Sequence, residues 1–200
     1  CKITVTPKPK PICNAPANVS AIYGQKLSDI ALVNTSGNTA GMWSWEQPDT
    51  SVGDVGTKNF KAIFTPDNTA DFAVVEDIDV SVTVEPKNIT VQVADIANQT
   101  YTGSQLKPTV TVTGDGKTLS FNTDYTVEYG ENVNVGSGSV TVKSKAGSNY
   151  IFTNTVKNFN IVAKAGQLTI SGDLDVTYGT EVPDVIVNRN GSDGAVTIYY

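Results

Sequence analysis

The sequence predicts an all-β protein made of antiparallel β-sandwiches arranged in tandem. The first observation is strict alternation of Val or Ile with Thr, Ser, Gln or Lys, a period of two that fits half-buried strands. It recurs in residues 79–85, 90–95, 109–114 and 139–144. The second observation is that turn-forming clusters separate the strand-like stretches. These clusters occupy residues 65–71, 113–118, 134–139 and 188–194.

The third observation is an internal repeat. A short Tyr-Gly phrase recurs at Tyr23, Tyr101 and Tyr178, and these tyrosines are 78 and 77 residues apart. A second phrase, which closes a strand-like stretch with lysine, recurs at Lys8, Lys87 and Lys164 with spacings of 79 and 77 residues. Two independent markers with one period indicate repeated structural units rather than chance similarity.

The period divides the chain into four segments. Residues 1–12 are interpreted as the last strand of a preceding repeat, 13–87 and 88–164 as complete repeats, and 165–200 as a partial third repeat. Each complete repeat has room for about seven strands, and the repeats are expected to form an elongated array. The chain is therefore expected to be an excerpt of a longer protein. Its incomplete ends, Lys2 to Pro7 and 165–200, would leave strand edges open and are expected to pack on a neighbouring chain or be poorly ordered.

The Tyr-Gly phrase is predicted to be a structural turn after the first strand of each repeat. Glycine permits the positive φ of a tight turn, and the tyrosine ring can cover the edge of the sandwich. The turn residues are Tyr23, Gly24, Tyr101, Gly103, Tyr178 and Gly179. A ligand-contacting role for the tyrosines is the alternative. Between the strand-like stretches, residues 25–32 are compatible with one helical turn.

Composition excludes several classes of function. The chain has 20 acidic and 14 basic residues and a net charge of −6, which disfavours nucleic acid and anionic membranes as partners. No apolar run approaches the roughly 18 to 20 residues of a membrane span. The chain contains no histidine, the commonest general base and transition-metal ligand, so no catalytic residues, metal site or cofactor are predicted.

Cys1 and Cys13 are interpreted either as isolated thiols or as a disulfide that closes a short loop.

Trp43 and Trp45 are the candidate ligand-contacting residues. They are two positions apart and therefore share one face of a predicted strand. Two exposed indoles on a flat face would form a platform for sugar stacking, whereas two buried indoles would fill the core of a small repeat. The core interpretation is favoured for at least one of them, because the repeat has few other large side chains.

Two further chemistries have partial signals. Asp67, Asp71, Glu76, Asp77 and Asp79 form an acidic run, but the run lacks the loop signature of a calcium site, and a solvated turn is favoured over a bridging calcium. An intramolecular isopeptide bond needs a lysine, an asparagine on an adjacent strand and a buried acid. Lys157, Asn158 and Asn160 supply some of these groups on one late strand.

Residues 43–87 resemble the tandem Ig-like repeats of large bacterial cell-surface and adhesin-type proteins. The matching positions are Trp43, Trp45 and Pro48, then Phe64, Thr65, Pro66 and Phe72, then Val82, Val84, Pro86 and Lys87. Residues 88–164 are similar to a sister type of repeat through Tyr101, Gly103, Pro108, Asp124, Tyr125, Val127, Tyr129, Asn149 and Tyr150. Asn68, Ala70 and Asp71 depart from the pattern, in which relatives often carry Asp and Asn-Tyr.

The resemblance implies Ig-like sandwiches that are extracellular, non-enzymatic and exposed on a bacterial surface. A β-grasp-like repeat, also found among adhesins, is the alternative fold for the Tyr-Gly units. Two functions follow as hypotheses. The repeats are stalk or spacer modules that contact neighbouring repeats of the same chain, or they are themselves adhesive and bind a host or cell-surface glycan or protein.

Overall fold

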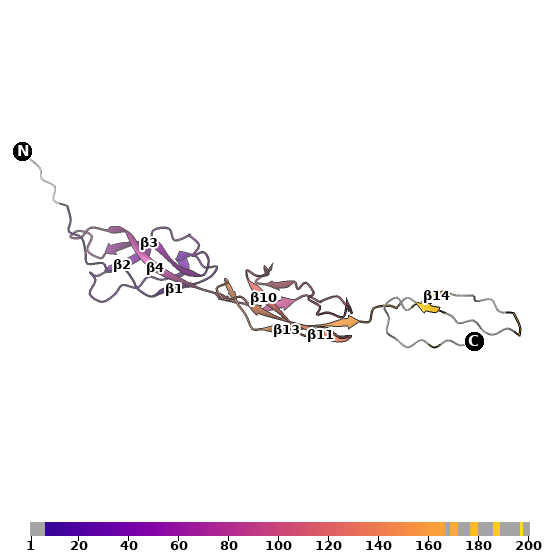
Figure 1. Cartoon of the computed structure of the whole chain (residues 1–200). Coiled ribbons are helices and arrows are strands. Elements are labelled where there is room, and N and C mark those ends of the chain that lie inside the picture. The colour runs from indigo at the N-terminus through magenta and orange to yellow at the C-terminus, as the bar shows by residue number, and fades with distance from the viewer. Residues whose placement is uncertain (1–6, 167–168, 172–176, 180–185, 189–196, 198–200) are drawn as a thin grey trace, which may run out of the picture. The chain divides into compact units, whose positions relative to one another are not determined.

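The computed structural model describes residues 7–166, 169–171, 177–179, 186–188 and 197 (Figure 1). Within these residues the protein is all-β and contains several sheets and no α-helix. One 3-10 turn, η1 (Leu27–Asp29), lies in the segment compatible with a helical turn. The prediction of the all-β class is confirmed, since the alternating stretches 79–85 and 139–144 lie inside two long strands.

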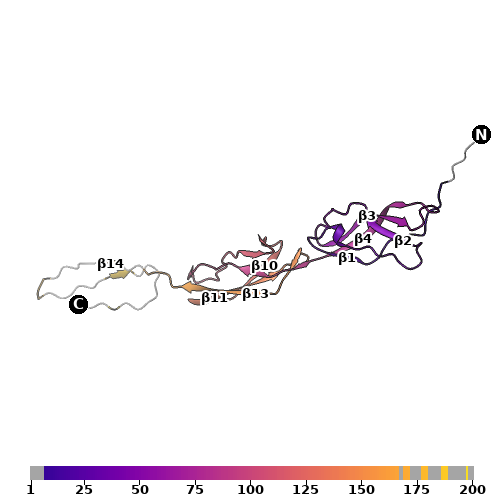
Figure 2. The same ribbon diagram turned by 180° about the vertical axis from the view of Figure 1, so that it is seen from behind.

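The first sheet contains four strands in the order β1-β4-β3-β2. Their bounds are β1 (Val19–Ile22), β2 (Gly41–Trp45), β3 (Gly56–Pro66) and β4 (Val75–Glu85). Strands β2, β3 and β4 pair antiparallel, whereas β1 pairs parallel with β4. Both ribbon views show these strands side by side (Figures 1 and 2). Strand β1 is therefore an edge strand, bonded to the last strand of the same sheet.

The remaining strands form smaller sheets and one further four-stranded sheet. The four-stranded sheet has the order β10-β11-β13-β7, with β7 (Gln99–Thr100), β10 (Tyr125–Tyr129), β11 (Gly136–Ser144) and β13 (Thr155–Val162). A three-stranded sheet contains β6 (Val91–Val93), β8 (Val112–Gly114) and β9 (Lys117–Thr118). Two-stranded pairs join β5 (Lys87–Asn88) to β12 (Tyr150–Ile151) and β14 (Thr169–Ser171) to β15 (Ile186–Asn188).

The chain divides into two compact units. Unit 1 comprises residues 1–95, 109–128 and 140–157, and unit 2 comprises residues 96–108, 129–139 and 158–200. Strands β10, β11 and β13 contain residues of both units. The predicted repeat borders at residues 12, 87 and 164 rest on sequence periodicity and stay a prediction.

One face of the first sheet carries the core of this part of unit 1. Alternation along β4 turns Val80, Val82 and Val84 inward, and each is at most 1% exposed. Phe64 of β3 is completely buried beside them. Burying one such side chain stabilises the fold by about 1.5–3 kcal/mol. The period of two read from the sequence is thus the period of burial.

Irregular segments, rather than a second sheet of several strands, cover this core. Of the expected seven strands per repeat, residues 13–85 contain the four strands of the first sheet. Prolines in the N-terminal segment, which cannot donate to a ladder, help explain the difference. Cys13, Ala15, Leu27, Ile30 and Leu32 of the irregular segments pack on the sheet instead.

The turn at Asp115 is a tight hairpin, as the cluster at 113–118 predicts. Asp115 and Gly116 have φ values of 52° and 74°, the positive pair that a two-residue turn between twisted strands requires. The cluster at 134–139 behaves differently, because β11 already begins at Gly136. A Cβ at Gly138 would lie 2.5 Å from the Phe159 ring, so this glycine serves close packing within a strand rather than a turn.

The first and last strands pair in the same way in two places. In the first sheet, β1 runs parallel to β4, and the Tyr23 N–H donates to Glu85 O at 2.9 Å. In the second four-stranded sheet, β7 runs parallel to β13, and the Tyr101 N–H donates to Val162 O at 2.8 Å. The two tyrosines of the repeated phrase therefore occupy the same topological position, one residue after the first strand.

The expectations for the chain ends fall mainly on residues that are not described. The predicted N-terminal strand, Lys2 to Pro7, lies outside the described residues except for Pro7. Most of 165–200 also lies outside them, and its described strands β14 and β15 pair antiparallel.

Candidate functional site

A cluster of aromatic and charged side chains, within unit 1, joins the Tyr-Gly turn to residues of the second predicted repeat. Tyr23 and Tyr150 meet edge to face, with ring centroids 5.4 Å apart and an interplanar angle of 83°. Such a pair contributes about 0.5–1.5 kcal/mol beyond its buried area. The Lys117 ammonium lies 4.9 Å from the Tyr150 ring centroid and 5.8 Å from that of Tyr23. This geometry allows cation–π attraction to both rings.

Asn149 holds the loop that precedes β3. Its side-chain Oδ1 accepts a hydrogen bond from the Val55 N–H at 2.9 Å, and its Nδ2 donates to Asp54 Oδ1 at 2.8 Å. One carboxamide therefore satisfies both a backbone donor and a carboxylate. Asn149 and Tyr150 are consecutive, so the double hydrogen bond and the aromatic contact lie next to each other. We call the three residues that Asn149 and Tyr150 contact (Tyr23, Asp54 and Val55) the Tyr23 surface.

Backbone pairing anchors the same region. Strand β5 lies parallel to β12, and the Lys87 N–H donates to Asn149 O at 3.0 Å. The Lys87 ammonium also pairs with Asp115 Oδ1 at 2.5 Å. The segment that follows β4 is therefore held by the pairing of β5 with β12 and by the Lys87–Asp115 ion pair, and it is not a free linker.

Charge in the cluster is set by burial and by the lysine. Burial raises the pKa of the Tyr23 phenol above its ordinary value of 10.0, and the Lys117 ammonium acts against this increase. The polar interaction with the Tyr150 hydroxyl raises the pKa of the Lys117 ammonium above 10.5. Among described residues, the buried Tyr150 Oη has no partner in hydrogen-bond geometry, so its attraction to the Lys117 ammonium is electrostatic. At neutral pH the Tyr23 phenol is therefore neutral and Lys117 is a cation.

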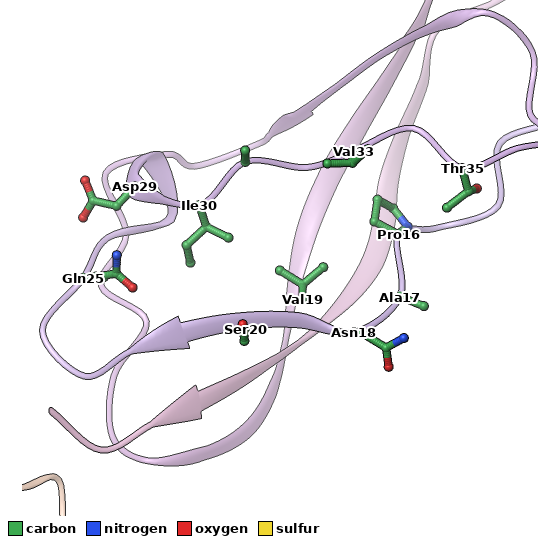
Figure 3. Close-up of a pocket in the computed structure, with 11 residues that line it drawn as sticks. Pro16, Ala17, Asn18, Val19, Ser20, Gln25, Asp29, Ile30, Val33 and Thr35 are labelled. Carbon is green, nitrogen blue, oxygen red and sulfur yellow. The ribbon is translucent and has the colours of Figure 1, made fainter. Parts of the chain in front are cut away.

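A groove lies beside the edge strand β1 (Figure 3). It is an open depression of about 410 Å³ between residues 16–20 and residues 25–35. Figure 3 shows Val19 and Ile30 facing the space between the two segments, with Gln25 and Asp29 toward one end. The Val33 side chain, which also lines the groove, is 71% exposed. The mixed lining, with apolar side chains such as Val19, Ile30 and Val33 beside polar ones, suits an extended peptide more than a small charged molecule.

The structure places both tryptophans in the core. Trp43 and Trp45 are 9% and 8% exposed, and their rings contact Phe64 and Phe60. The Trp45 indole N–H donates to Ile30 O at 2.9 Å, which satisfies its polar group on burial. Neither indole offers the exposed ring face that a sugar-stacking platform requires.

Tyr23-Gly24 and Tyr178-Gly179 lie in turns, as predicted, whereas Gly103 lies in a bend two residues after Tyr101. Gly24, Gly103 and Gly179 have φ values of 95°, 79° and 92°. The tyrosines before them differ in exposure: Tyr23 is partly buried, Tyr101 is 39% exposed and Tyr178 is fully exposed. Each phrase therefore has a glycine with positive φ within two residues of its tyrosine, whereas the exposure of the tyrosine ring differs among the three.

The remaining candidates do not assemble a reactive site within the described residues. Cys13 is a partly buried free thiol, and Cys1 lies outside those residues. The acidic run from Asp67 to Asp79 belongs to no group of three or more possible metal ligands. Lys157 pairs with Asp95 Oδ1 at 2.5 Å, while Asn158 and Asn160 are exposed on the opposite face of β13.

Sequence reasoning missed Asp54, Lys117 and the role of Asn149. Nothing in the residue types marks these positions, because their partners are distant in the chain. A faint signal exists in the triplet Asp54-Val55-Gly56, which is echoed by Asn134-Val135-Gly136 eighty residues later. Aligning the repeats on this triplet as well as on the tyrosine would have pointed to the surface.

Comparisons of the chain with protein-family models, with curated proteins and with solved structures find no match. No helix among the described residues has the length and apolar character needed to cross a membrane.

Proposed function

We propose that the chain consists of tandem Ig-like β-sandwich repeats that serve as non-enzymatic stalk or spacer modules of a bacterial cell-surface, adhesin-like protein. The observation that carries this proposal is the parallel pairing of first and last strands, β1 with β4 and β7 with β13. Because the two strands of each pair are parallel, the first strand begins at one end of their hydrogen-bonded ladder and the last strand finishes at the opposite end.

This pairing suits a module that bears tension. Pulling on the two ends of such a module displaces the paired strands lengthwise, so all hydrogen bonds between them carry the force together. Strands pulled apart from one shared end would instead lose their bonds one at a time. The anchoring of Lys87 and Asn149 by backbone pairing adds support, because it limits bending after β4.

The proposal is tested by pulling the full chain through two different pairs of residues. Cysteine handles at Ala17 and Glu85 load the β1–β4 ladder along its length, whereas handles at Ala17 and Ser81 peel it from one end. All three positions are exposed, and Cys1→Ser with Cys13→Ser removes the native thiols. We expect a clearly higher rupture force with the first pair of handles. Equal forces in both geometries would contradict a load-bearing role for the pairing.

The second candidate function is adhesion by the repeats themselves, to a host or cell-surface glycan or protein. The groove beside β1 favours a protein ligand, since an edge strand can accept an added strand. Screening the full chain against glycans and extended peptides tests this idea. Specific binding that Val33→Glu abolishes and Met42→Glu preserves would support it, because both side chains are 71% exposed but only Val33 lines the groove.

A further inference from the structure

The Tyr23 surface has a counterpart in unit 2. Tyr101 follows β7 as Tyr23 follows β1, and both backbone N–H groups donate to the last residue of the parallel partner strand. Gly136 begins β11 with a φ of 133°, as Gly56 begins β3 with a φ of 124°. The residues before these glycines, Asp54-Val55 and Asn134-Val135, therefore occupy equivalent places.

In both units, hydrogen bonds join the loop after the tyrosine to the segment before the glycine, although the bonded positions differ. In unit 1, the loop after Tyr23 bonds to the segment before Gly56 through Leu27 N–H to Thr50 O and Val52 N–H to Gln25 O. In unit 2, the loop after Tyr101 bonds to the segment before Gly136. The Leu106 N–H donates to Asn132 O, and the Gln105 side chain donates to Gly130 O. We call Tyr101, Asn134 and Val135 the Tyr101 surface.

The two surfaces differ in what covers them. Tyr23 and Val55 are partly buried, because Tyr150 and Asn149 lie against them. Tyr101 and Val135 are 39% and 55% exposed, and Asn134 is also exposed. Val162, the strand end that accepts the Tyr101 N–H, is 39% exposed as well. Tyr101 and Val135 are thus exposed at the positions where their counterparts Tyr23 and Val55 are partly covered.

We propose that the Tyr101 surface is a docking site for a following module of the same kind, which contributes an asparagine, an adjacent tyrosine and a lysine as Asn149, Tyr150 and Lys117 do at the Tyr23 surface. The inference rests on the proposed function and specifies its partner. The asparagine carboxamide accepts from the Val135 N–H and donates to Asn134 Oδ1, which replaces the Asp54 carboxylate as acceptor. The tyrosine edge and the ammonium cover the Tyr101 ring.

The experiment inserts a second copy of residues 88–164 directly after Lys164 in the full chain. This keeps a lysine before the inserted Asn88-Ile89, as Lys87 precedes them in the native chain. Amide hydrogen exchange is followed at Val55 and at Val135 of the first copy. An Asn149→Ala variant of the first copy provides the calibration. The factor by which it accelerates exchange at Val55 is the effect of removing one such carboxamide. We expect the insertion to slow exchange at Val135 by a similar factor.

The matched control is the same insertion with the asparagine that corresponds to Asn149 changed to alanine in the inserted copy only. It should return Val135 exchange to the rate of the original chain and leave Val55 unchanged. Unaltered Val135 exchange in the insertion variant, with normal protection of the inserted strands, would overturn the proposal. If the force measurement on β1 and β4 failed while Val135 became protected, the proposed function would fall and the docking site would stand.

Discussion

Asn149 is the residue whose removal reports most directly on the contacts at the Tyr23 surface. Its carboxamide bridges the Val55 N–H and Asp54 Oδ1, and it is only partly exposed. Asn149→Ala is expected to lower the free energy of unfolding by about 0.5–1.5 kcal/mol, because the backbone donor then depends on water. Urea unfolding of the full chain measures this loss. Asn158→Ala, on the exposed face of β13, should change stability far less, and equal effects of the two variants would argue against the bridge.

The Tyr23–Lys117–Tyr150 cluster is expected to lose stability in alkali. The folded pKa of Tyr23 is raised above 10.0, so the unfolded phenol ionises first and rising pH favours unfolding. The folded pKa of Lys117 is raised above 10.5, so its stabilising contribution is complete below that value and disappears as the pH passes the folded pKa. Both groups act in the same direction, and stability should fall above about pH 10.

Thermal unfolding of the wild type and of Tyr23→Phe between pH 8 and 11 checks this prediction. The variant retains the ring but lacks the ionisable hydroxyl, so its stability should decline less steeply with pH. Tyr178→Phe, which changes a fully exposed side chain, is the matched control. A Tyr23→Phe profile that parallels the wild type would show that the phenol is not the titrating group.

At the scale of elements, Gly41 fixes how closely β2 approaches β3. A Cβ at this position would lie 2.5 Å from Thr65 O and 2.8 Å from Pro66 Cα, both backbone atoms of β3. Gly41→Ala is therefore expected to destabilise the fold by about 1–3 kcal/mol through overpacking. Differential scanning calorimetry against Ser44→Ala, on the exposed face of the same strand, isolates the effect. A melting temperature equal to that of the control would contradict the close approach.

The positions of the strands could be predicted from the sequence more accurately than the number of strands. Alternation in residues 79–85 predicts β4 because each inward valine is buried against the same core. The spacing of valines along the sequence therefore shows which side of the strand faces the core. The segments that cover this core have no such period. Leu27, Ile30 and Val52 reach the core from a 3-10 turn and from coil, so seven strands were too many for residues 13–87.

The candidate site was only partly readable from sequence, for the same physical reason. Tyr23 and Gly24 could be assigned to a turn because the φ of Gly24 is a local property. Lys117 and Asn149 act through contacts with residues roughly ninety positions away, and no local pattern encodes such pairing. The tryptophans illustrate the converse, since an alternating strand predicts a shared face for Trp43 and Trp45 but cannot tell the core face from the solvent face without the partners.

At the scale of the whole molecule, the chain repeats one arrangement in which the first strand lies parallel to the last. In both places the tyrosine phrase follows the first strand, and buried residues alternate along the last strand: Val80, Val82 and Val84 in β4, and Phe159 and Ile161 in β13. Contacts at the Tyr23 surface then connect the first sheet to residues 109–128 and 140–157 of the same unit. The proposed spacer function uses this arrangement, because modules built in this way can be added in series without new chemistry.

The equivalence of the two tyrosines is tested most directly by amide hydrogen exchange in the full chain, resolved at Tyr23 and Tyr101. Both N–H groups donate to the end of a parallel partner strand, at 2.9 and 2.8 Å. Both are therefore expected to exchange far more slowly than unprotected amides. Rapid exchange at either tyrosine, with protection at the other, would contradict the repeated arrangement of first and last strands.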